Sequence, residues 1–348
     1  MLNRATPETL IFPNPDPPKP GETIEVRPGV FWARFPLPFR LDHVNIYLIA
    51  DGEGWAVLDC GIGDEACRAV WQAVLAGPLA GARLTRLIVT HYHPDHVGLA
   101  GWMCEQYGLG LLMPRSEYLF SFGLQYAPGD LGAENYRRFY RRHGLPDAIA
   151  EQVLGRGHHY LRITTGVPAT YHRLQAGQTL TLGTRAVSVL TGAGHALEQA
   201  MLLDAPSGLF FAADQVIARI SPNVSVHAME PEADALGDYL RSLAALRCEV
   251  PAAALVLPGH GLPFFGLHAR IAALVRHHAE RCAVIAEACR AAPRSAVDLV
   301  PIVFQRELDP HQTSFAFGEV LAHVNHMRAA ATLAAETDAD GRVRFRTL

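Results

Sequence analysis

The stretch HYHPDH, residues 91–96, decides the fold of this chain. It directly follows a short apolar run, so it begins where a strand is expected to end. Its three imidazoles and one carboxylate are ligand types that Zn²⁺ and similar divalent ions prefer. In an extended backbone His91 and His93 point to the same side. Asp95 and His96 fall where the chain turns into the next helix, so we expect them to face a different metal ion.

Four other apolar runs also deliver an aspartate or a histidine at or just past their carboxyl ends. These residues are Asp59, His195, Asp214 and His260. The carboxyl edge of the strands is where ligand sites form in α/β sheets. One such coincidence has little weight, but five runs with the same feature predict a shared site at one edge.

A single ion cannot accommodate all of these side chains, whereas a pair of ions can. The first ion is expected to bind His91, His93 and His195. The second ion is expected to bind Asp95, His96 and His260. Asp214 would bridge the two ions together with a water or hydroxide. Ions in such two-metal sites lie about 3.5–4 Å apart.

Short apolar runs alternate with helical patterns over most of the chain, which is typical of an α/β fold. Strands are expected at residues 44–49, 55–58, 87–89, 186–190, 209–212 and 255–257. Helices are expected between them at residues 64–75, 97–107 and 234–246.

The motif H-x-H-x-D-H resembles that of the metallo-β-lactamase fold hydrolases. The later metal positions of that family match Gly194-His195, Asp214 and Pro258-Gly259-His260, so the resemblance covers roughly residues 30–261. It implies an αββα sandwich, in which two mixed sheets pack together with helices outside. It also implies that Asp59 supports the metal-binding loop and does not bind metal itself.

The chain departs from the family pattern in three respects. His93 is not glutamate, which argues against the activity of the di-iron, oxygen-reducing relatives. Ala213 precedes Asp214 where glycine often occurs, and we expect little effect. An insertion between the second and third motifs is absent from minimal members of the family.

The resemblance implies a dinuclear metal-dependent hydrolase. A hydroxide that bridges the ions would attack a small ester, thioester or lactone, with zinc as the expected metal and iron or manganese as alternatives. Asp95 is expected to orient the nucleophile and to shuttle its proton. The alternative function is a metal-dependent ribonuclease or phosphodiesterase. A binding protein without catalysis is a third class, against which the complete ligand set argues.

Three segments are predicted along the chain. Residues 1–28 form a Pro-rich N-terminal arm, residues 29–266 form the catalytic domain with a helical insertion at about 116–160, and residues 267–348 form a C-terminal domain. The C-terminal domain should contain a long helix, two further helices and a hairpin that turns at Asp340-Gly341. One of these helices opens with a capping box at 295–298. This order outlines a small winged-helix-like domain, and it resembles the extension of a family branch that includes a mitochondrial endoribonuclease.

The segment YRRFYRR, residues 136–142, leaves three interpretations open. It is a solvated helix whose aromatic side chains pack on the body, or a lid whose arginines meet an anionic substrate such as a CoA or carboxylate ester. In the third interpretation it binds nucleic acid, because arginine and aromatic side chains also suit phosphates and bases. The pairs His158-His159 and His277-His278 are expected on solvated helices.

The composition sets the remaining limits. A chain of 348 residues with 49% hydrophobic and 18% charged residues is typical of a globular protein. Its net charge of −4 gives no general attraction to nucleic acid, so the expected partner is a small molecule, an anionic one included, with nucleic acid as an open alternative. No uncharged apolar run reaches the ~18 residues that a membrane span needs.

The six cysteines form no CxxC motif, which indicates reduced thiols in a cytoplasmic protein. The C-terminal domain shows no dense basic face. We therefore interpret it as a module for homodimerisation or for covering the pocket.

Overall fold

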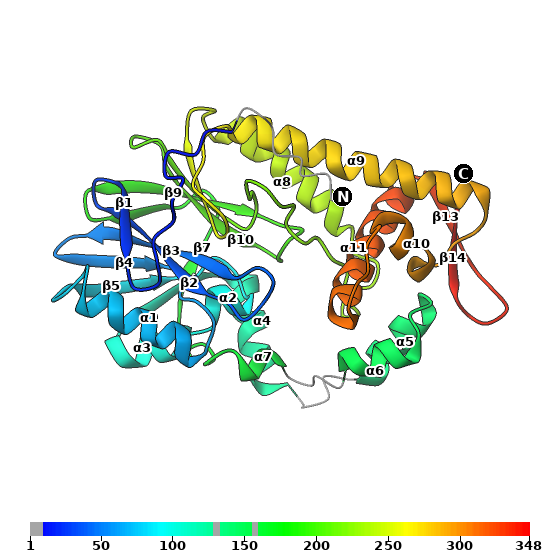
Figure 1. Cartoon of the computed structure of the whole chain (residues 1–348), viewed down its shortest axis with the longest axis horizontal. Coiled ribbons are helices and arrows are strands. Elements are labelled where there is room, and N and C mark those ends of the chain that lie inside the picture. Colours follow the sequence, from blue (N-terminus) through cyan, green and yellow to red (C-terminus); the bar gives the residue numbers. More distant parts are fainter. Residues whose placement is uncertain (1–9, 128–132, 155–158) are drawn as a thin grey trace.

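The computed structural model describes residues 10–127, 133–154 and 159–348. Within these residues two β-sheets pack face to face, helices cover their outer faces, and a helical C-terminal region adjoins the sandwich (Figure 1). The expected α/β sandwich with two mixed sheets is therefore confirmed. Residues 1–9 of the predicted arm and residues 128–132 and 155–158 of the predicted insertion lie outside the described part of the chain.

The first sheet has the strand order β1-β2-β3-β4-β5-β6-β7. Neighbours from β1 to β4 pair antiparallel, and neighbours from β4 to β7 pair parallel. Its strands are β1 (Thr23–Arg27), β2 (Val30–Pro36), β3 (His43–Asp51), β4 (Gly54–Leu58), β5 (Arg83–Ile88), β6 (Gly110–Pro114) and β7 (His172–Leu174).

The second sheet has the strand order β12-β11-β10-β9-β8. Strands β11 and β12 pair parallel, and the other neighbours pair antiparallel. Its strands are β8 (Thr179–Leu182), β9 (Arg185–Gly192), β10 (Gln199–Asp204), β11 (Leu209–Ala213) and β12 (Leu255–Pro258).

A buried apolar layer holds the two sheets together. It includes Trp32 and Ile49 of the first sheet and Val189, Phe211 and Leu257 of the second. Full burial of each such aliphatic or phenyl side chain contributes about 1.5–3 kcal/mol. Side chains on the opposite face of each sheet pack against helices instead, so the strands are buried on both faces.

Helices α1 (Glu65–Ala76) and α3 (Ala100–Tyr107) pack on the outer face of the first sheet. The Asp64 side chain begins α1 by accepting a hydrogen bond from the Cys67 backbone N–H at 2.8 Å. The short helix α2 (Pro94–Val97) precedes α3, so the helix expected at 97–107 is divided in two. Helices α8 (Ala235–Glu249) and α9 (Leu267–Ala291) cover the second sheet.

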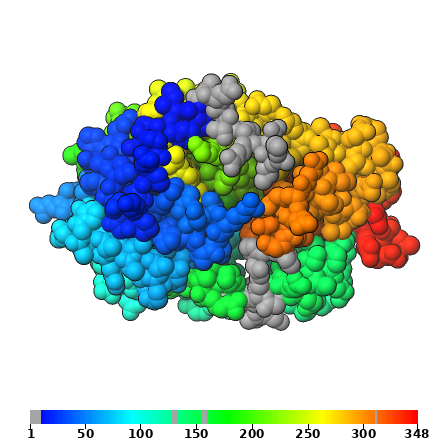
Figure 2. Space-filling model, viewed as in Figure 1, coloured from blue at the N-terminus to red at the C-terminus, as the bar shows by residue number. Residues whose placement is uncertain are grey.

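The insertion is helical in its described residues. It consists of α4 (Arg115–Tyr126), α5 (Ala133–Arg142), α6 (Asp147–Leu154) and α7 (His159–Arg162). Phe139 of α5 packs in one buried cluster with Phe317 of the C-terminal region. The insertion therefore lies against the C-terminal region, and Figure 2 shows these two parts in orange and green at one end of the molecule.

After α9 the C-terminal region continues with α10 (Ala296–Val303), α11 (Pro310–Ala329) and a hairpin of β13 (Leu333–Thr337) and β14 (Val343–Thr347). The predicted capping box is present, because Ser295 and Asp298 bond to each other's backbone N–H. Gly341 has a φ of 78°, as the expected turn requires. The helical C-terminal region is confirmed in this order of elements.

Two expectations differ from the structure. Strand β1 lies inside residues 1–28, because no proline occurs between Pro20 and Pro28 and Val26 can be buried in the sheet. His278 is buried and not solvated, because α11 covers this face of α9. The domain boundaries at 28/29 and 266/267 stay predictions. Among the described residues, every helix is too short or too polar to cross a membrane.

Candidate metal centre

The turn between β5 and α2 carries the HYHPDH stretch. His91 and His93 stand on the extended part of the turn, and Pro94 begins α2 because proline is tolerated at the first helical position. Asp95 and His96 therefore lie in a helical turn, as expected. The change from extended to helical backbone at Pro94 thus separates His91 and His93 from Asp95 and His96.

The second sheet supplies three further side chains at the same edge. His195 follows β9, Asp214 follows β11 directly, and His260 follows β12. Loops after both sheets therefore meet there, and all seven predicted ligands come together. In β11 and β12 the parallel pairing places the two carboxyl ends side by side.

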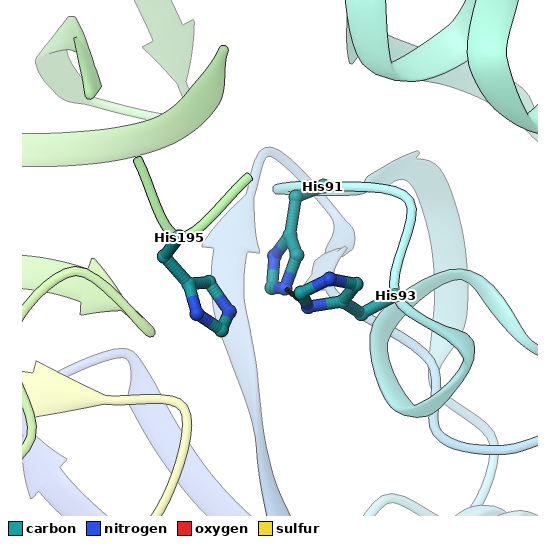
Figure 3. A group of neighbouring side chains, drawn as sticks. All are labelled: His91, His93 and His195. Carbon is teal, nitrogen blue, oxygen red and sulfur yellow. Dashed lines mark hydrogen bonds between the residues drawn. The ribbon is translucent and has the colours of Figure 1, made fainter. Parts of the chain in front are cut away.

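His91, His93 and His195 form the first cluster, in which one ligand nitrogen of each ring lies within 4.8 Å of the others. Nε2 of His91 is 3.0 Å from Nδ1 of His93, and the rings of His93 and His195 are 4.6 Å apart between centroids. Figure 3 shows His195 facing the other two imidazoles from the opposite side.

Asp95, His96 and His260 form the second cluster by the same criterion. Asp214 lies between the clusters. Its carboxylate oxygens are 3.4 Å from His195 Nε2, 3.1 Å from His260 Nε2 and 3.5 Å from His96 Nε2. These are two adjacent His/Asp clusters, consistent with a dinuclear metal site in which Asp214 is shared.

Asp59 stands behind both clusters. One carboxylate oxygen accepts a hydrogen bond from the Thr90 backbone N–H at 2.8 Å, and the other accepts from the Thr90 hydroxyl and from His96 Nδ1. The Thr90 hydroxyl is in turn 2.9 Å from His91 Nδ1. Asp59 thus orients one imidazole directly and another through Thr90, and it presents no oxygen to the centre.

Backbone carbonyls orient the two remaining imidazoles of the second sheet. His195 Nδ1 donates to the Asn223 carbonyl at 2.8 Å, and His260 Nδ1 donates to the His43 carbonyl at 2.7 Å. A donor at Nδ1 leaves Nε2 as the free lone pair, which fixes the tautomer for metal binding. In the sequence His43 resembles an ordinary polar residue, but in the structure its carbonyl supports the centre.

The electrostatics of the centre also fit a cation. Burial lowers the pKa of His93 to about 3, so this ring is a neutral ligand at pH 7. Burial opposes the charged form of His260, but Asp214 and Asp95 prevail and raise its pKa to about 10. Burial likewise opposes ionisation of Asp214, yet His260 and His96 hold its pKa well below the usual value. A metal ion that binds here would displace the proton that the raised pKa keeps on His260.

Buried polar atoms without hydrogen-bond partners test whether these residues fit metal ions. Within the described residues His96 Nε2, His195 Nε2 and Asp214 Oδ1 are buried and have no hydrogen-bond partner. Such atoms cost about 1–3 kcal/mol each when they are left unsatisfied. All of them point to the centre, and imidazole nitrogen and carboxylate oxygen are the donors that zinc, iron and manganese accept. The residues therefore fit a pair of divalent ions.

The backbone beside the metal centre is strained at two residues and packs closely against the ligands at a third. Asp59 and Ala213 have positive φ values of 63° and 44° although neither is glycine. The alanine at 213, where glycine often occurs in the family, therefore places backbone strain at this position, because glycine adopts a positive φ without strain. A Cβ atom on Gly259 would lie 2.2 Å from Asp214 Oδ1 and 2.9 Å from His96 Cε1.

Glu117 of α4 is a functional residue that the sequence analysis missed. It is fully buried, and its two oxygens accept from the backbone N–H of Tyr92 at 2.9 Å and of Glu198 at 2.5 Å. Burial raises its pKa to about 7. Glu117 therefore joins the loop of His91 and His93 to the loop of His195. The sequence around it reads as an ordinary helix, so it gives no signal.

Comparisons with known proteins agree with this geometry. The family described as Metallo-beta-lactamase superfamily matches residues 39–260, and the family described as Metallo-beta-lactamase-like, C-terminal domain matches residues 282–348. The chain is 25% identical over 287 residues to the Bacillus subtilis (strain 168) protein named "Probable metallo-hydrolase YqjP", which covers 79% of this chain and 86% of that protein.

Two solved structures resemble nearly the whole chain. A beta-lactamase domain protein from Burkholderia ambifaria is 40% identical, with a TM-score of 0.90 over 97% of this chain and 98% of that one. A metallo-beta-lactamase family protein from Thermus thermophilus is 26% identical, with a TM-score of 0.77 over 93% of this chain and 100% of that one.

The fold and the paired His/Asp clusters define a metal-dependent hydrolase. The chain belongs to the metallo-beta-lactamase superfamily, and it carries a metallo-beta-lactamase-like C-terminal domain.

Proposed function

We propose that the protein hydrolyses a small ester, thioester or lactone with two divalent metal ions. The observation that carries this proposal is the position of Asp214 between the two clusters, where its carboxylate lies 3.4 Å from His195 Nε2 and 3.1 Å from His260 Nε2. His91, His93, His195 and Asp214 would hold one ion. Asp95, His96, His260 and Asp214 would hold the other. When bound, such ions activate water as a nucleophile and neutralise the charge that develops on the substrate oxygen.

Asp95 is proposed as the residue that orients the nucleophile and moves its proton. Its carboxylate is 19% exposed, whereas that of Asp214 is 7% exposed, so Asp95 lies nearer to the open side of the centre. Its Oδ2 is 3.3 Å from His260 Nε2, which holds the carboxylate in place. A carboxylate at this position can accept a proton from water and return it to the leaving group.

The proposal has a direct experiment. Purified full-length protein is analysed for metals and then assayed with a thioester, a lactone and a phosphodiester. We expect about two equivalents of metal and turnover of the acyl substrates, and His93→Ala should lose the turnover together with the ion that His93 would hold. Protein that binds metal but acts on none of the three substrates would support the binding-protein alternative. Turnover of the phosphodiester alone would replace the proposal by the nuclease alternative.

The nuclease alternative has less support from the contacts of the arginine run. Arg137 pairs with Glu151 at 2.6 Å, and Arg141 pairs with Asp147 at 2.8 Å. Two of the four arginines that would meet a phosphate backbone thus already have a carboxylate partner. The net charge of −4 also gives no general attraction to a polyanion.

Three finer features belong to the same proposal. Zinc is proposed as the metal, because imidazole-rich sites with carboxylates suit it. The order α10, α11, β13, β14 supports a winged-helix-like C-terminal module, which we propose to cover the pocket or to form a homodimer. A cytoplasmic location is proposed because all six cysteines are free thiols.

A further inference from the structure

A groove runs between helix α5, the loop at 223–229 and helix α11. Its inner part is a cavity of about 120 Å³ lined by Tyr136, Phe139, Ser225 and Phe317 among others. Its outer part is a cavity of about 390 Å³, where Arg138, Arg142 and Met229 join Tyr136 and Phe139. The two cavities are neighbours that both have Tyr136 and Phe139 in their lining, and we call them together the α5 groove.

The α5 groove adjoins the metal centre through the loop at 223–229. The Asn223 carbonyl accepts the hydrogen bond from His195 Nδ1, and Ser225 lines the inner cavity only two residues later. Two residues of extended chain span at most about 7 Å. The Ser225 hydroxyl also donates to the Asn223 side chain at 3.0 Å, which keeps this short connection compact. The wall of the groove thus begins within two residues of the carbonyl that orients His195, so the groove is close to the metal centre.

The arginines of α5 divide into two pairs with different surroundings. Arg137 and Arg141 have carboxylate partners on α6. Arg138 and Arg142 are exposed, lie one helical turn apart and line the groove. Within the described residues neither has an ion-pair partner, and the contact of Arg138 with Asn135 is a neutral one. The uncompensated guanidinium groups are thus those that face the binding space.

The rest of the groove surface is apolar or aromatic. Tyr136 is half-buried and Phe139 is buried, and both rings face the cavities. Met229 leaves 64% of its surface exposed at the rim. Large exposed apolar groups beside a cavity usually mark a site of binding, because water contact with them is unfavourable. The groove thus combines two free cations with an aromatic wall.

We propose that the α5 groove binds the non-reacting end of an anionic, amphipathic substrate. Arg138 and Arg142 hold a carboxylate or phosphate group, and Tyr136, Phe139 and Met229 contact the apolar part next to it. This inference rests on the proposed function and names its substrate class as organic anions with an ester or thioester bond. Arginine suits this task because its planar guanidinium binds such oxygens in a bidentate manner.

The kinetic test uses two esters of equal length and opposite character. One is 4-nitrophenyl hexanoate, and the other is mono-4-nitrophenyl adipate, which carries a carboxylate at the far end. We expect the wild type to prefer the adipate ester by about tenfold in kcat/KM, mostly through KM, as two charge-assisted contacts suggest. Arg138→Gln/Arg142→Gln should lose this preference, so that its kcat/KM values for the two esters become equal.

The matched control is Arg137→Gln/Arg141→Gln, which removes the same charge from α5 at two arginines that do not line the groove. It should keep the preference for the adipate ester. Equal turnover of the two esters by the wild type, or a preference that both double variants lose alike, would overturn the inference. Either result leaves metal-dependent ester hydrolysis in place, so the proposed function is judged separately.

A binding measurement covers the case in which neither ester reacts. The probe is 8-anilinonaphthalene-1-sulfonate, an aromatic organic anion whose fluorescence rises on binding. We expect Arg138→Gln/Arg142→Gln and Tyr136→Ala to raise its Kd about fivefold or more and the control pair to leave it unchanged. Unchanged affinity in the folded variants would overturn the inference. Displacement of the probe by an RNA oligonucleotide with steep salt dependence, without any preference for the adipate ester, would also overturn it.

Discussion

The geometry of the metal centre depends on residues that are not themselves ligands. Asp59 accepts a hydrogen bond from Nδ1 of His96, and the carbonyls of Asn223 and His43 accept hydrogen bonds from Nδ1 of His195 and of His260. Each of these acceptors decides which nitrogen the ring presents. Such supporting contacts typically change metal affinity by about 10–100-fold when they are removed, so single substitutions outside the ligand set should be informative.

Glu117 offers one such test. In Glu117→Gln the side chain keeps its size, but its NH₂ group must face one of the two backbone N–H groups of Tyr92 and Glu198. The two ligand loops then lose a shared acceptor. We expect metal affinity to fall about tenfold or more, measured by competition with a chromogenic chelator. The fold should remain intact by circular dichroism.

Glu105→Gln is the matched control, because Glu105 is exposed on α3. It removes the same charge and should leave metal affinity unchanged. Equal affinity of Glu117→Gln and wild type would show that the two loops are held by other contacts, and it would remove Glu117 from the support of the centre.

Gly259 tests the close packing of the bridging carboxylate. In Gly259→Ala the new Cβ would overlap with Asp214 Oδ1, so the carboxylate must move. We expect metal content to fall by at least about half and the free energy of unfolding to decrease by about 1–3 kcal/mol, as in other overpacked sites. Gly123→Ala on α4 is the control, because its Cβ would meet nothing within 4 Å. Full metal content in Gly259→Ala would contradict this account of the site.

Among the helices and strands, the sequence predicted those in which apolar residues recur at a regular spacing. The strands expected at 44–49 and 255–257 lie in β3 and β12, and the helix expected at 234–246 lies in α8. All of these segments have apolar residues at regular spacing and turn residues at their ends. The strand-end histidines and aspartates were found for the same reason, because a strand that ends at a ligand is visible locally.

The elements that were missed depend on distant partners. Strand β7 has three residues and is a strand because β6 pairs with it. The burial of His278 could not be predicted for the same reason. Its position in the sequence shows which face of α9 it occupies, but not that α11 covers this face. Glu117 could not be found either, because its partners are backbone N–H groups of two remote loops, which no side-chain pattern records.

The buried pair of His278 and His323 predicts a pH dependence of stability. His323 Nδ1 donates to the Glu319 carbonyl at 2.7 Å, so its Nε2 accepts from His278 Nδ1 at 3.1 Å, and a second proton on His323 would face the N–H of His278. Burial lowers the pKa of His278 to about 2 and of His323 to about 3. Below about pH 6.5 the unfolded chain binds protons that the folded chain does not, so stability falls as the pH decreases.

The measurement is urea unfolding at about pH 7.5 and about pH 5.5, on either side of the ordinary histidine pKa. We expect His278→Leu/His323→Leu to lose less stability between these values than the wild type, by about 3 kcal/mol for two histidines. His172→Gln on the exposed strand β7 is the control and should behave as the wild type does. A double variant with the full wild-type loss would mean that other groups cause the acid sensitivity.

At the scale of the whole molecule, the metal centre is the place where the two halves of the sandwich meet. The loop and helix after β5 supply four of the proposed ligands, and the loops after β9, β11 and β12 supply the other three. Tyr47 and Asn45 of β3 also donate to the Pro258 carbonyl at 2.8 and 2.9 Å. These direct contacts across the sheets place the ligand loops before any ion is bound, so the fold does not depend on metal alone.

Metal removal should therefore lower stability without abolishing the fold. Bound ions would cross-link the two sheets, and a ligand at about 100 times its Kd stabilises a folded protein by about 2.7 kcal/mol. We expect exhaustive chelation to lower the Tm by at least about 3 °C and to leave the far-ultraviolet circular dichroism unchanged at about 25 °C. Re-addition of Zn²⁺ should restore the Tm. A His93→Ala/His260→Ala variant, which lacks one ligand of each cluster, controls for direct effects of the chelator, because it should show a low Tm with and without chelation. An unchanged Tm in wild-type protein that elemental analysis shows to be stripped of metal would mean that the ligands of the two sheets are not joined through ions.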